Sequence, residues 1–415
     1  MVIGLFKKEK YNIVNDPKDA DIIVINTCGF IKPAKEEAIN TILEMAEYKN
    51  SGKCKYLIVM GCLAERYKEE LEVALPEVDL IIPIKEYDIF FQKVNELLNK
   101  NKENKELDYL DRVISTGNKT AYLKIAEGCS NRCTYCAIPY IRGPYISRNI
   151  EDVLEEAEKL AKDGYEEIIV IAQDTTKYGI DLYGEEKLAE LLERLGKIDG
   201  IKWIRFLYSY PESITDELIK VVKENDKICK YFDIPLQHIS NNVLKRMNRK
   251  SNKESTEKLI KKLRKEIPNV IIRTTFMVGF PGETEEDFNQ LYEFVKKAKF
   301  EKMGAFKYSK EDGTPAEKLK EQVHYQTKQS RYNKIMELEK NISKEKLQEK
   351  IGNEYEVIID GITEDGKYYI ARSYMDIPDQ DGVIFIKNDN KNKVGNFINC
   401  KITDVIDYDF IGEEV

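Results

Sequence analysis

The 415-residue chain contains no apolar run near the roughly 20 residues that a helix needs to cross a bilayer. Its first ten residues also lack an apolar core of signal-peptide length, so we expect neither a membrane span nor a secretion signal. Histidine is scarce, with two in the chain, whereas there are eight cysteines. Eight cysteines without an export signal indicate a reducing compartment, and a cytoplasmic location is expected.

Most of the chain also lacks an excess of either charge. The net charge is −8, and residues 346–415 alone carry 8 Lys or Arg against 15 Asp or Glu. Almost all of the excess negative charge therefore lies in this C-terminal segment. An acidic segment binds phosphate backbones poorly and suits a basic protein, so a nucleic acid is not an expected partner.

Three cysteines, Cys129, Cys133 and Cys136, lie within eight residues with the spacing C-x3-C-x2-C. No fourth ligand follows nearby, since the next cysteine is Cys229 and the first histidine is His238. A closed structural zinc site takes four protein ligands, whereas three thiolates on a four-iron cluster leave one iron open. The spacing favours such an iron–sulfur cluster. A zinc knuckle and three reduced core thiols are the alternatives.

Alternating strands and helices are predicted for residues 1–98. The predicted elements are, in order, a helix at the start of the chain, a strand Asp21–Asn26, a helix over 33–49, a strand Tyr56–Gly61, a further helix and a short strand Val78–Pro83. Continuous apolar strands separated by helices indicate a parallel α/β sheet. Ligands of such sheets collect beyond the carboxyl ends of the strands, where Cys28 and Cys62 are expected to converge. Taken singly, each would be interpreted as a buried thiol. Cys54 precedes its strand and should lie at the opposite end.

A second α/β region begins near Lys119. Its predicted strands are Tyr122–Ala126, Glu167–Ala172, Lys202–Leu207, Tyr231–Ile234, Ile271–Val278 and Lys302–Lys307, with helices such as 150–163 and 254–266 between them. Six β/α units predict a partial TIM-like (β/α)6 barrel, with chemistry in the loops after the strands. The three-cysteine loop follows the first of these strands, as a barrel active site requires.

The C-terminal region changes to short strands after a long helix over 325–350. The predicted strands are 354–360, 367–373, 382–386 and 396–405, which suggest a small OB-like β-barrel. We therefore predict an N-terminal domain over 1–98, a linker over 99–114, a barrel domain over 115–345 and a C-terminal domain over 346–415.

The cysteine spacing resembles the signature of the radical S-adenosylmethionine superfamily. There the open iron chelates S-adenosylmethionine, which the reduced cluster cleaves to methionine and a 5′-deoxyadenosyl radical. Tyr135 matches the aromatic position that packs near the adenine; loop packing is the alternative role. The order of the three modules resembles the methylthiotransferases over essentially the whole chain, with a C-terminal TRAM domain. This resemblance implies a second [4Fe-4S] cluster, for which Cys28 and Cys62 match two ligands, and a low-potential electron donor of the flavodoxin or ferredoxin type.

Within that family the chain resembles the RimO type. The matching segments are 172–179, 233–238, 371–378 with Asp381 and Gly382, and 404–409. The RimO type adds a methylthio group to the β-carbon of an aspartate in small-subunit ribosomal protein twelve, and the acidic C-terminal region favours this protein substrate. The alternatives are a methylthiotransferase acting on tRNA adenosine and an iron–sulfur protein that inserts no sulfur.

The start of the chain departs from the family pattern. The family's first cluster cysteine lies on an N-terminal strand, before a helix that residues 1–8 of this chain already match. We therefore expect that first strand and its cysteine to be missing. The two explanations are a reading frame that starts upstream and a second cluster that is absent or differently ligated.

Four polar residues are predicted to position S-adenosylmethionine or the target side chain. Gln173 and Gln237 follow the second and fourth barrel strands, where active-site residues of such barrels lie. Arg148 and Arg273 are candidates to bind a carboxylate, because a guanidinium matches it in a bidentate fork. The alternative roles are hydrogen bonding to loop backbone for the glutamines and salt bridges for the arginines.

Overall fold

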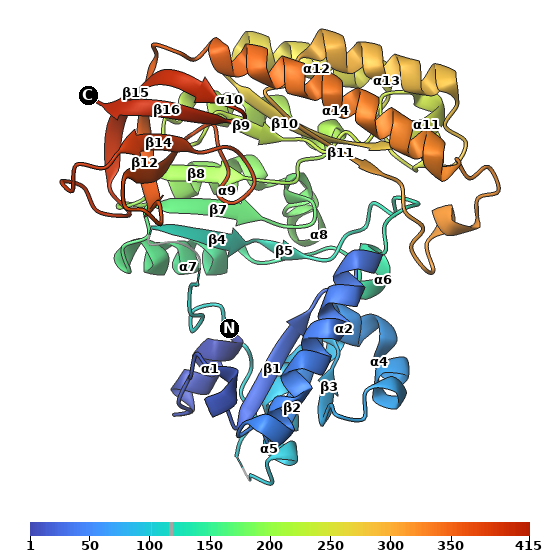
Figure 1. Cartoon of the computed structure of the whole chain (residues 1–415), viewed down its shortest axis with the longest axis vertical. Coiled ribbons are helices and arrows are strands. Elements are labelled where there is room, and N and C mark those ends of the chain that lie inside the picture. The colour runs from blue at the N-terminus through green and yellow to red at the C-terminus, as the bar shows by residue number, and fades with distance from the viewer. Residues whose placement is uncertain (101, 116–118) are drawn as a thin grey trace. The chain divides into compact units, whose positions relative to one another are not determined.

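The computed structural model describes residues 1–100, 102–115 and 119–415. The chain divides into two compact units (Figure 1). The first, here the N-terminal unit, comprises residues 1–115, 128–145 and 310–317, and the second, the barrel unit, comprises the remainder. Residue 101 of the predicted linker and residues 116–118 of the predicted barrel domain lie outside the described residues, and the predicted domain boundaries stay predictions.

A three-stranded parallel sheet forms the centre of the N-terminal unit, with the strand order β1-β2-β3. Its strands are β1 (Ile22–Thr27), β2 (Tyr56–Gly61) and β3 (Leu80–Ile82). Its helices are α1 (Val2–Lys8), α2 (Lys32–Ala46), α3 (Tyr48–Ser51), α4 (Cys62–Ala74), α5 (Phe90–Leu97) and α6 (Ile138–Ile141), with the 3-10 turns η1 (Pro17–Asp19), η2 (Ile84–Ile89) and η5 (Pro315–Lys318) at its edges. The predicted parallel α/β sheet is confirmed, although the helix predicted over 33–49 is divided into α2 and α3.

Both faces of this sheet are covered because its strands are apolar on both sides. On one face Leu57 and Val59 pack with residues of α2 and α4, such as Ile42. On the other face Ile58 and Met60 pack with residues of α1 and α5. The sheet is thereby held from both sides, which fixes the positions of its strand ends.

Six parallel strands build the partial barrel of the barrel unit. They form two sheets, β4 (Thr120–Lys124), β7 (Glu167–Ile171) and β8 (Trp203–Phe206), and β9 (Tyr231–Asp233), β10 (Ile271–Val278) and β11 (Lys302–Lys307). A single parallel bridge, Ile204 to Ile228, connects β8 with the residues before β9. All six predicted strands are confirmed. The short pair β5 (Ala126–Glu127) and β6 (Ile146–Ser147) was not predicted.

Helices follow the barrel strands in sequence. They are α7 (Ile150–Lys162), α8 (Ile180–Tyr183), α9 (Leu188–Gly196), α10 (Asp216–Glu224), α11 (Asn241–Arg246), α12 (Lys253–Glu266), α13 (Glu285–Ala298) and the long α14 (Tyr325–Gln348), with the 3-10 turns η3 (Thr175–Lys177) and η4 (Pro211–Ser213). Across the described ranges, no helix combines the length and the apolar character needed to cross a membrane.

Five strands close the C-terminal barrel, in the order β12-β13-β14-β16-β15. They are β12 (Glu354–Ile362), β13 (Tyr368–Ser373), β14 (Ile384–Lys387), β15 (Phe397–Ile406) and β16 (Asp409–Glu414). The small barrel is as predicted, but its last strand was missed. β16 forms a hairpin with β15 through a tight turn in which Asp407 has a φ of 51°, and its few residues are half polar.

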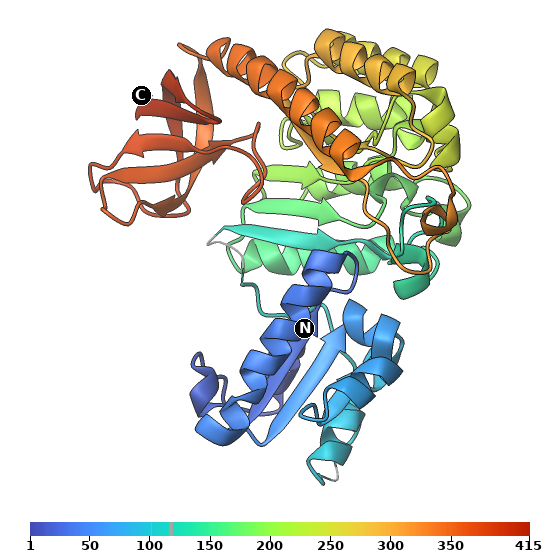
Figure 2. The same ribbon diagram turned by 45° about the vertical axis from the view of Figure 1, so that its right-hand side comes forward.

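The C-terminal barrel covers the N-terminal ends of the partial-barrel strands (Figures 1 and 2). Trp203, Tyr231 and Ile271, each the first residue of its strand, share a buried cluster with residues of β12 to β16. Gln173 and Gln237, two of the predicted cofactor residues, lie beyond the opposite, carboxyl ends of β7 and β9.

Candidate iron–sulfur and cofactor sites

Backbone hydrogen bonds fix the three-cysteine loop in the N-terminal unit. The Cys129 amide donates to the carbonyl of Gly143 at 3.2 Å, and the Cys136 amide donates to the carbonyl of Cys133 at 3.0 Å. Gly128 enters the loop with a φ of +76°, a conformation that favours glycine. The three sulfur atoms are thus carried on a short segment that is tied at both ends.

The chemistry of these thiols fits an iron–sulfur cluster. Cys129 and Cys133 are buried and Cys136 is half-buried. Burial raises the pKa of the Cys136 thiol to about 12, and the two neighbouring cysteines add to the rise. Such a thiol ionises when a metal cation supplies the compensating charge. Within the described ranges, no three cysteine, histidine or carboxylate side chains converge on a single metal ion. A four-iron cluster instead binds each thiolate to a separate iron.

Cys28 and Cys62 lie at equivalent ends of neighbouring strands, as predicted. Thr27, the last residue of β1, is paired in register with Gly61, the last residue of β2, and each is followed directly by its cysteine. Gly61 has a φ of +103°, and a Cβ atom there would lie 2.4 Å from the Thr27 carbonyl oxygen. Cys28 is exposed and Cys62 is buried. Cys54 lies before β2, at the opposite end of the sheet, so it is not near this pair.

Arg142, which the sequence did not suggest, connects the Cys62 site to the three-cysteine loop. Its Nη2 atom donates a hydrogen bond to the Cys62 sulfur at 3.2 Å. Cys62 also shares a small buried cluster with Ala137 and Ile141, which follow Cys136 in the chain. The two groups of cysteines are therefore parts of one compact unit.

Residues 310–317 contact the same unit through a second set of polar groups. The Ala316 amide donates to the Thr134 carbonyl inside the three-cysteine loop at 2.9 Å. The Tyr67 hydroxyl donates to Asp312 at 2.7 Å, and Lys35 lies 3.1 Å from the same carboxylate. This segment ties the loop to α2 and α4, and sequence patterns gave no signal for it.

Gln173 and Gln237 lie after β7 and β9 in the barrel unit, as predicted. Each has a buried Oε1 atom that accepts no hydrogen bond from the described residues. Gln237 has a φ of 68°, and its backbone is held by Thr275 at 2.8 Å and Met277 at 2.7 Å. A left-handed non-glycine residue and an unpaired buried oxygen both cost free energy, and such features cluster at functional sites.

Arg148 and Arg273 are engaged by carboxylates within the barrel unit. Arg148 forms an ion pair with the buried Glu156. Arg273 lies 3.1 Å from Asp233 and 3.5 Å from Asp381. These contacts match the salt-bridge alternative, and the predicted binding of a ligand carboxylate stays a prediction. Tyr135 is half-buried in the cysteine loop, and its predicted contact with adenine stays a prediction as well.

The turn after β10 organises the start of α13. Thr284 and Asp287 form a capping box there. The buried carboxylate of Glu283 accepts a hydrogen bond from the Phe280 amide at 3.0 Å. Burial lowers the pKa of His238 to about 3, so this side chain is a neutral residue of the barrel interior.

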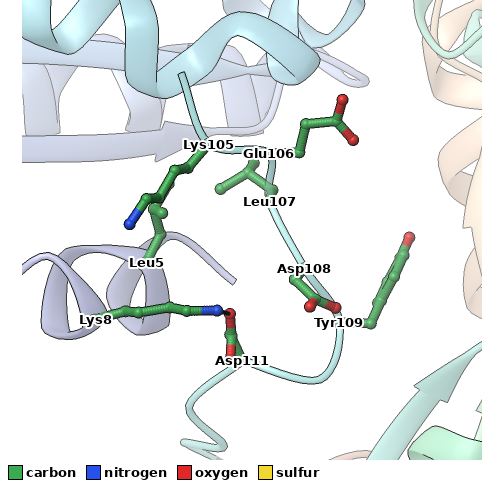
Figure 3. Close-up of a pocket in the computed structure, with 8 residues that line it drawn as sticks. All are labelled: Leu5, Lys8, Lys105, Glu106, Leu107, Asp108, Tyr109 and Asp111. Atoms are coloured by element: carbon green, nitrogen blue, oxygen red, sulfur yellow. Dashed lines mark hydrogen bonds and ion pairs between the residues drawn. The ribbon is translucent and has the colours of Figure 1, made fainter. Parts of the chain in front are cut away.

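A surface pocket of about 430 Å³ lies between α1 and residues 105–111 of the N-terminal unit (Figure 3). Lys8 and Asp111 form an ion pair at its rim. Its lining includes none of the cysteines and none of the predicted cofactor residues. The pocket is therefore separate from the candidate cluster and cofactor residues.

Comparisons with known proteins agree with the three modules. The model of the Radical SAM superfamily matches residues 123–295, that of the uncharacterized protein family UPF0004 matches residues 1–83, and that of the TRAM domain matches residues 351–415. Among solved structures, the radical S-adenosylmethionine methyltransferase TsrM from Kitasatospora setae has a TM-score of 0.55 at 13% identity. The match covers 72% of this chain and 64% of TsrM, and it supports the fold alone.

Curated relatives match nearly the whole chain. The ribosomal protein uS12 methylthiotransferase RimO of Alkaliphilus oremlandii is 63% identical over 414 residues, which cover 99% of this chain and 94% of that protein. The RimO protein of Acetivibrio thermocellus is 48% identical over 429 residues, which cover 100% of this chain and 94% of that protein. The chain therefore belongs to the RimO family of radical S-adenosylmethionine methylthiotransferases, whose cofactors are [4Fe-4S] clusters and S-adenosylmethionine.

Proposed function

We propose that this chain adds a methylthio group to the β-carbon of an aspartate in ribosomal protein uS12. The observation that carries the proposal is the grouping of Cys129, Cys133 and Cys136 with Cys28 and Cys62 in one compact unit. Methylthio transfer needs a centre for radical formation and a centre for sulfur delivery. Two groups of thiols in one unit supply ligands for both.

Radical chemistry suits this substrate position. The β-C–H bond of an aspartate is too weakly acidic for removal by a general base. When bound, the reduced cluster supplies the electron that cleaves S-adenosylmethionine and yields a radical able to abstract that hydrogen. Cys129, Cys133 and Cys136 would hold this cluster, and the burial of Cys129 and Cys133 would keep their sulfurs from water.

The barrel residues supply positioning. The buried Oε1 atoms of Gln173 and Gln237 can each accept a hydrogen bond from an amino or amide group of a ligand. They are better candidates than Arg148 and Arg273, whose guanidinium groups already contact carboxylates. Removing either arginine from its partner would leave a buried carboxylate uncompensated.

The C-terminal barrel supplies the docking surface in this proposal. Its excess of acidic residues attracts a basic ribosomal protein and repels the phosphate backbone of tRNA. The cytoplasm, where ribosomal proteins are made and assembled, is the proposed location. A flavodoxin or ferredoxin is the proposed electron donor.

The test is an anaerobic assay of the reconstituted full chain with S-adenosylmethionine, a sulfide source, a low-potential reductant and uS12. We expect mass spectrometry to find one methylthio group replacing a hydrogen on an aspartate. Cys133→Ala should abolish both the product and the formation of 5′-deoxyadenosine. The matched control is Cys54→Ala, which changes a buried cysteine of the same unit that lies away from both groups. A product on tRNA, with uS12 left unmodified, would overturn the proposal.

A further inference from the structure

Positive charge is concentrated in two short segments of the barrel unit. Residues 241–253 contain five Lys or Arg and no Asp or Glu, and residues 318–334 contain five Lys or Arg and one Glu. The chain carries a net charge of −8, so these segments run against its overall composition. They are far apart in the sequence and form one surface only if the fold brings them together.

Contacts around the turn after β10 bring the two segments together. Arg246, the last residue of α11, forms an ion pair with Glu321. The Gly282 amide in that turn donates to the Glu321 carbonyl at 2.7 Å. Lys328 of α14 packs over the same turn, where a Cβ atom on Gly279 would clash with its side chain. Because the turn follows β10, both segments meet at the carboxyl ends of the partial-barrel strands.

Three lysines of these segments have no charge partner within the described ranges. Lys245, Lys250 and Lys320 are exposed, and none of them forms an ion pair there. Lys328 is fixed at the turn, where its ammonium group donates to the Tyr308 carbonyl at 2.8 Å. Exposed ammonium groups without carboxylate partners attract anions such as phosphates.

An exposed aromatic ring accompanies these charges. Tyr325, the first residue of α14, is 65% exposed. The ammonium group of Lys307, at the end of β11, lies 5.0 Å from the centre of its ring. Such a ring offers a stacking face to a nucleic-acid base, while the ammonium groups around it bind the backbone. The basic surface is defined here as Lys245, Lys250, Lys307, Lys320, Lys328 and Tyr325.

The position of the basic surface favours RNA as its partner. The proposed substrate is a ribosomal protein, and RNA surrounds such a protein in the small ribosomal subunit. The target aspartate must be held at the carboxyl ends of the strands, so RNA beside it would meet the basic surface. The acidic C-terminal barrel, for which a nucleic acid is not expected, covers the opposite ends.

We propose that the basic surface binds the RNA next to uS12, so that the preferred substrate is uS12 already bound to RNA in the small ribosomal subunit. The inference rests on the proposed function for the identity of the protein substrate. The lysines bind phosphates, and Tyr325 stacks on an unpaired base. The two ends of the partial barrel then bind different parts of one ribonucleoprotein, its RNA and its basic protein.

The first test measures binding of a short, labelled single-stranded RNA to the full chain by fluorescence anisotropy at several salt concentrations. We expect the parent chain to bind the RNA with an affinity that falls as salt rises. A triple variant should reduce the slope of log affinity against log salt by about 2, because each phosphate contact on a single strand contributes about 0.7. Its substitutions are Lys245→Gln, Lys250→Gln and Lys320→Gln.

Two further variants separate charge from stacking and from general surface effects. Tyr325→Ala should weaken RNA binding about tenfold and leave the slope unchanged, since stacking on a base releases no counterions. The matched control removes three exposed lysines from α12 and should change neither affinity nor slope. Its substitutions are Lys258→Gln, Lys261→Gln and Lys265→Gln.

The second test compares methylthiolation of free uS12 with that of uS12 in unmodified small ribosomal subunits. We expect the KM for the subunits to be about tenfold lower at low salt, and the triple variant of the basic surface to remove this difference. Its activity on free uS12 should match that of the parent chain, which shows that the variant is folded.

Three outcomes would overturn the inference. They are an unchanged slope in the triple variant, an equal loss in the α12 control, and binding of polyglutamate as tight as that of RNA, which would assign the surface to an acidic protein. RNA binding with uS12 left unmodified in both forms would refute the proposed function and leave the basic surface intact. Modification of free uS12 by a chain that binds no RNA would do the reverse.

Discussion

Replacing Glu167 with glutamine is expected to loosen the contact between the C-terminal barrel and the strands that it covers. Glu167 begins β7 and is fully buried. Its carboxylate accepts hydrogen bonds from Arg372 of β13 at 2.9 Å and from Arg205 of β8 at 3.2 Å. Thr120 of β4 donates to the same carboxylate at 2.8 Å. One carboxylate therefore compensates two buried guanidinium groups, one from each side of the contact.

The size of the effect follows from the charges that remain. Breaking a buried ion pair by removing one partner costs about 3–5 kcal/mol, because the other charge stays buried. Asp360 also contacts Arg372, at 2.6 Å, and offsets part of the charge of Arg372, so the lower end of this energy range applies. Burial alone would raise the pKa of Glu167, but Arg372 and Arg205 lower it to about 2. The lowered pKa independently indicates that the ionised carboxylate stabilises the folded state. We expect Glu167→Gln to reduce the free energy of unfolding by about 3 kcal/mol.

The assay uses the single tryptophan of the chain. Trp203 is buried at the start of β8, and its ring meets that of Phe397 in β15 edge-to-face, with centroids 5.0 Å apart. Its fluorescence therefore reports on separation of the C-terminal barrel from the strands. With a urea dependence of about 2 kcal/mol per molar, Glu167→Gln should lower the midpoint of the Trp203 transition by about 1.5 M.

The matched control is Glu193→Gln on α9, which makes the same chemical change in an exposed pair with Lys197. Screening by water makes such pairs weak, so its midpoint should match that of the parent chain. If Glu167→Gln also leaves the midpoint unchanged, the buried cluster does not hold the contact together. A double variant, Glu167→Gln with Arg372→Gln, should recover part of the loss, since fewer unpaired charges remain buried.

Three further predictions concern the pH dependence of Glu167, the glycine that ends β2 and the surface of the C-terminal barrel. Because the pKa of Glu167 is lowered from 4.5 to about 2, the stability that Glu167 contributes should be complete above pH 4.5 and be lost as the pH falls towards 2. Acid titration of Trp203 fluorescence in the parent chain and in Glu167→Gln checks this. Gly61→Ala should destabilise the N-terminal unit by at least about 3 kcal/mol, because the strain of a positive φ and a clash with the Thr27 carbonyl combine. Gly143→Ala, at a glycine that also has a positive φ but has open space around it, should cost about 1–2 kcal/mol. Hydrogen exchange of β1 and β2 compares the two variants. Charge reversal at exposed Asp404 and Glu413 of the C-terminal barrel should raise the KM for uS12 and leave kcat unchanged, whereas an unchanged KM at low salt would exclude docking there.

Local patterns were sufficient to predict the strand ends that carry the cysteines. The runs before Cys28 and Cys62 are apolar on both faces, so a buried parallel sheet was the consistent interpretation. In a parallel sheet the strand direction alone decides which end is the carboxyl end. The same rule placed Gln173 after β7 and excluded Cys54 from the pair.

Contacts between distant segments could not be predicted in the same way. Arg142 and Cys62 are 80 positions apart, and no periodicity indicates that α6 packs on α4. Arg372 lies in a segment that resembles the family, but its role depends on Glu167, 205 positions earlier. β16 was missed for a related reason, because half of its residues are polar and its pairing with β15 and β14 identifies it as a strand.

In the proposed function, the position of the C-terminal barrel separates substrate docking from chemistry. The acidic barrel covers the N-terminal ends of the strands, whereas Gln173 lies beyond the carboxyl end of β7. From Glu167 to Gln173 an extended chain rises about 20 Å at 3.3 Å per residue. A protein substrate held by the acidic barrel must therefore present its aspartate on an extended segment of about six residues or more. Under that proposal, charges on the barrel act on capture of the substrate, and residues at the carboxyl ends act on the bond that reacts. Charge reversal on the barrel is therefore expected to change KM and to leave kcat unchanged.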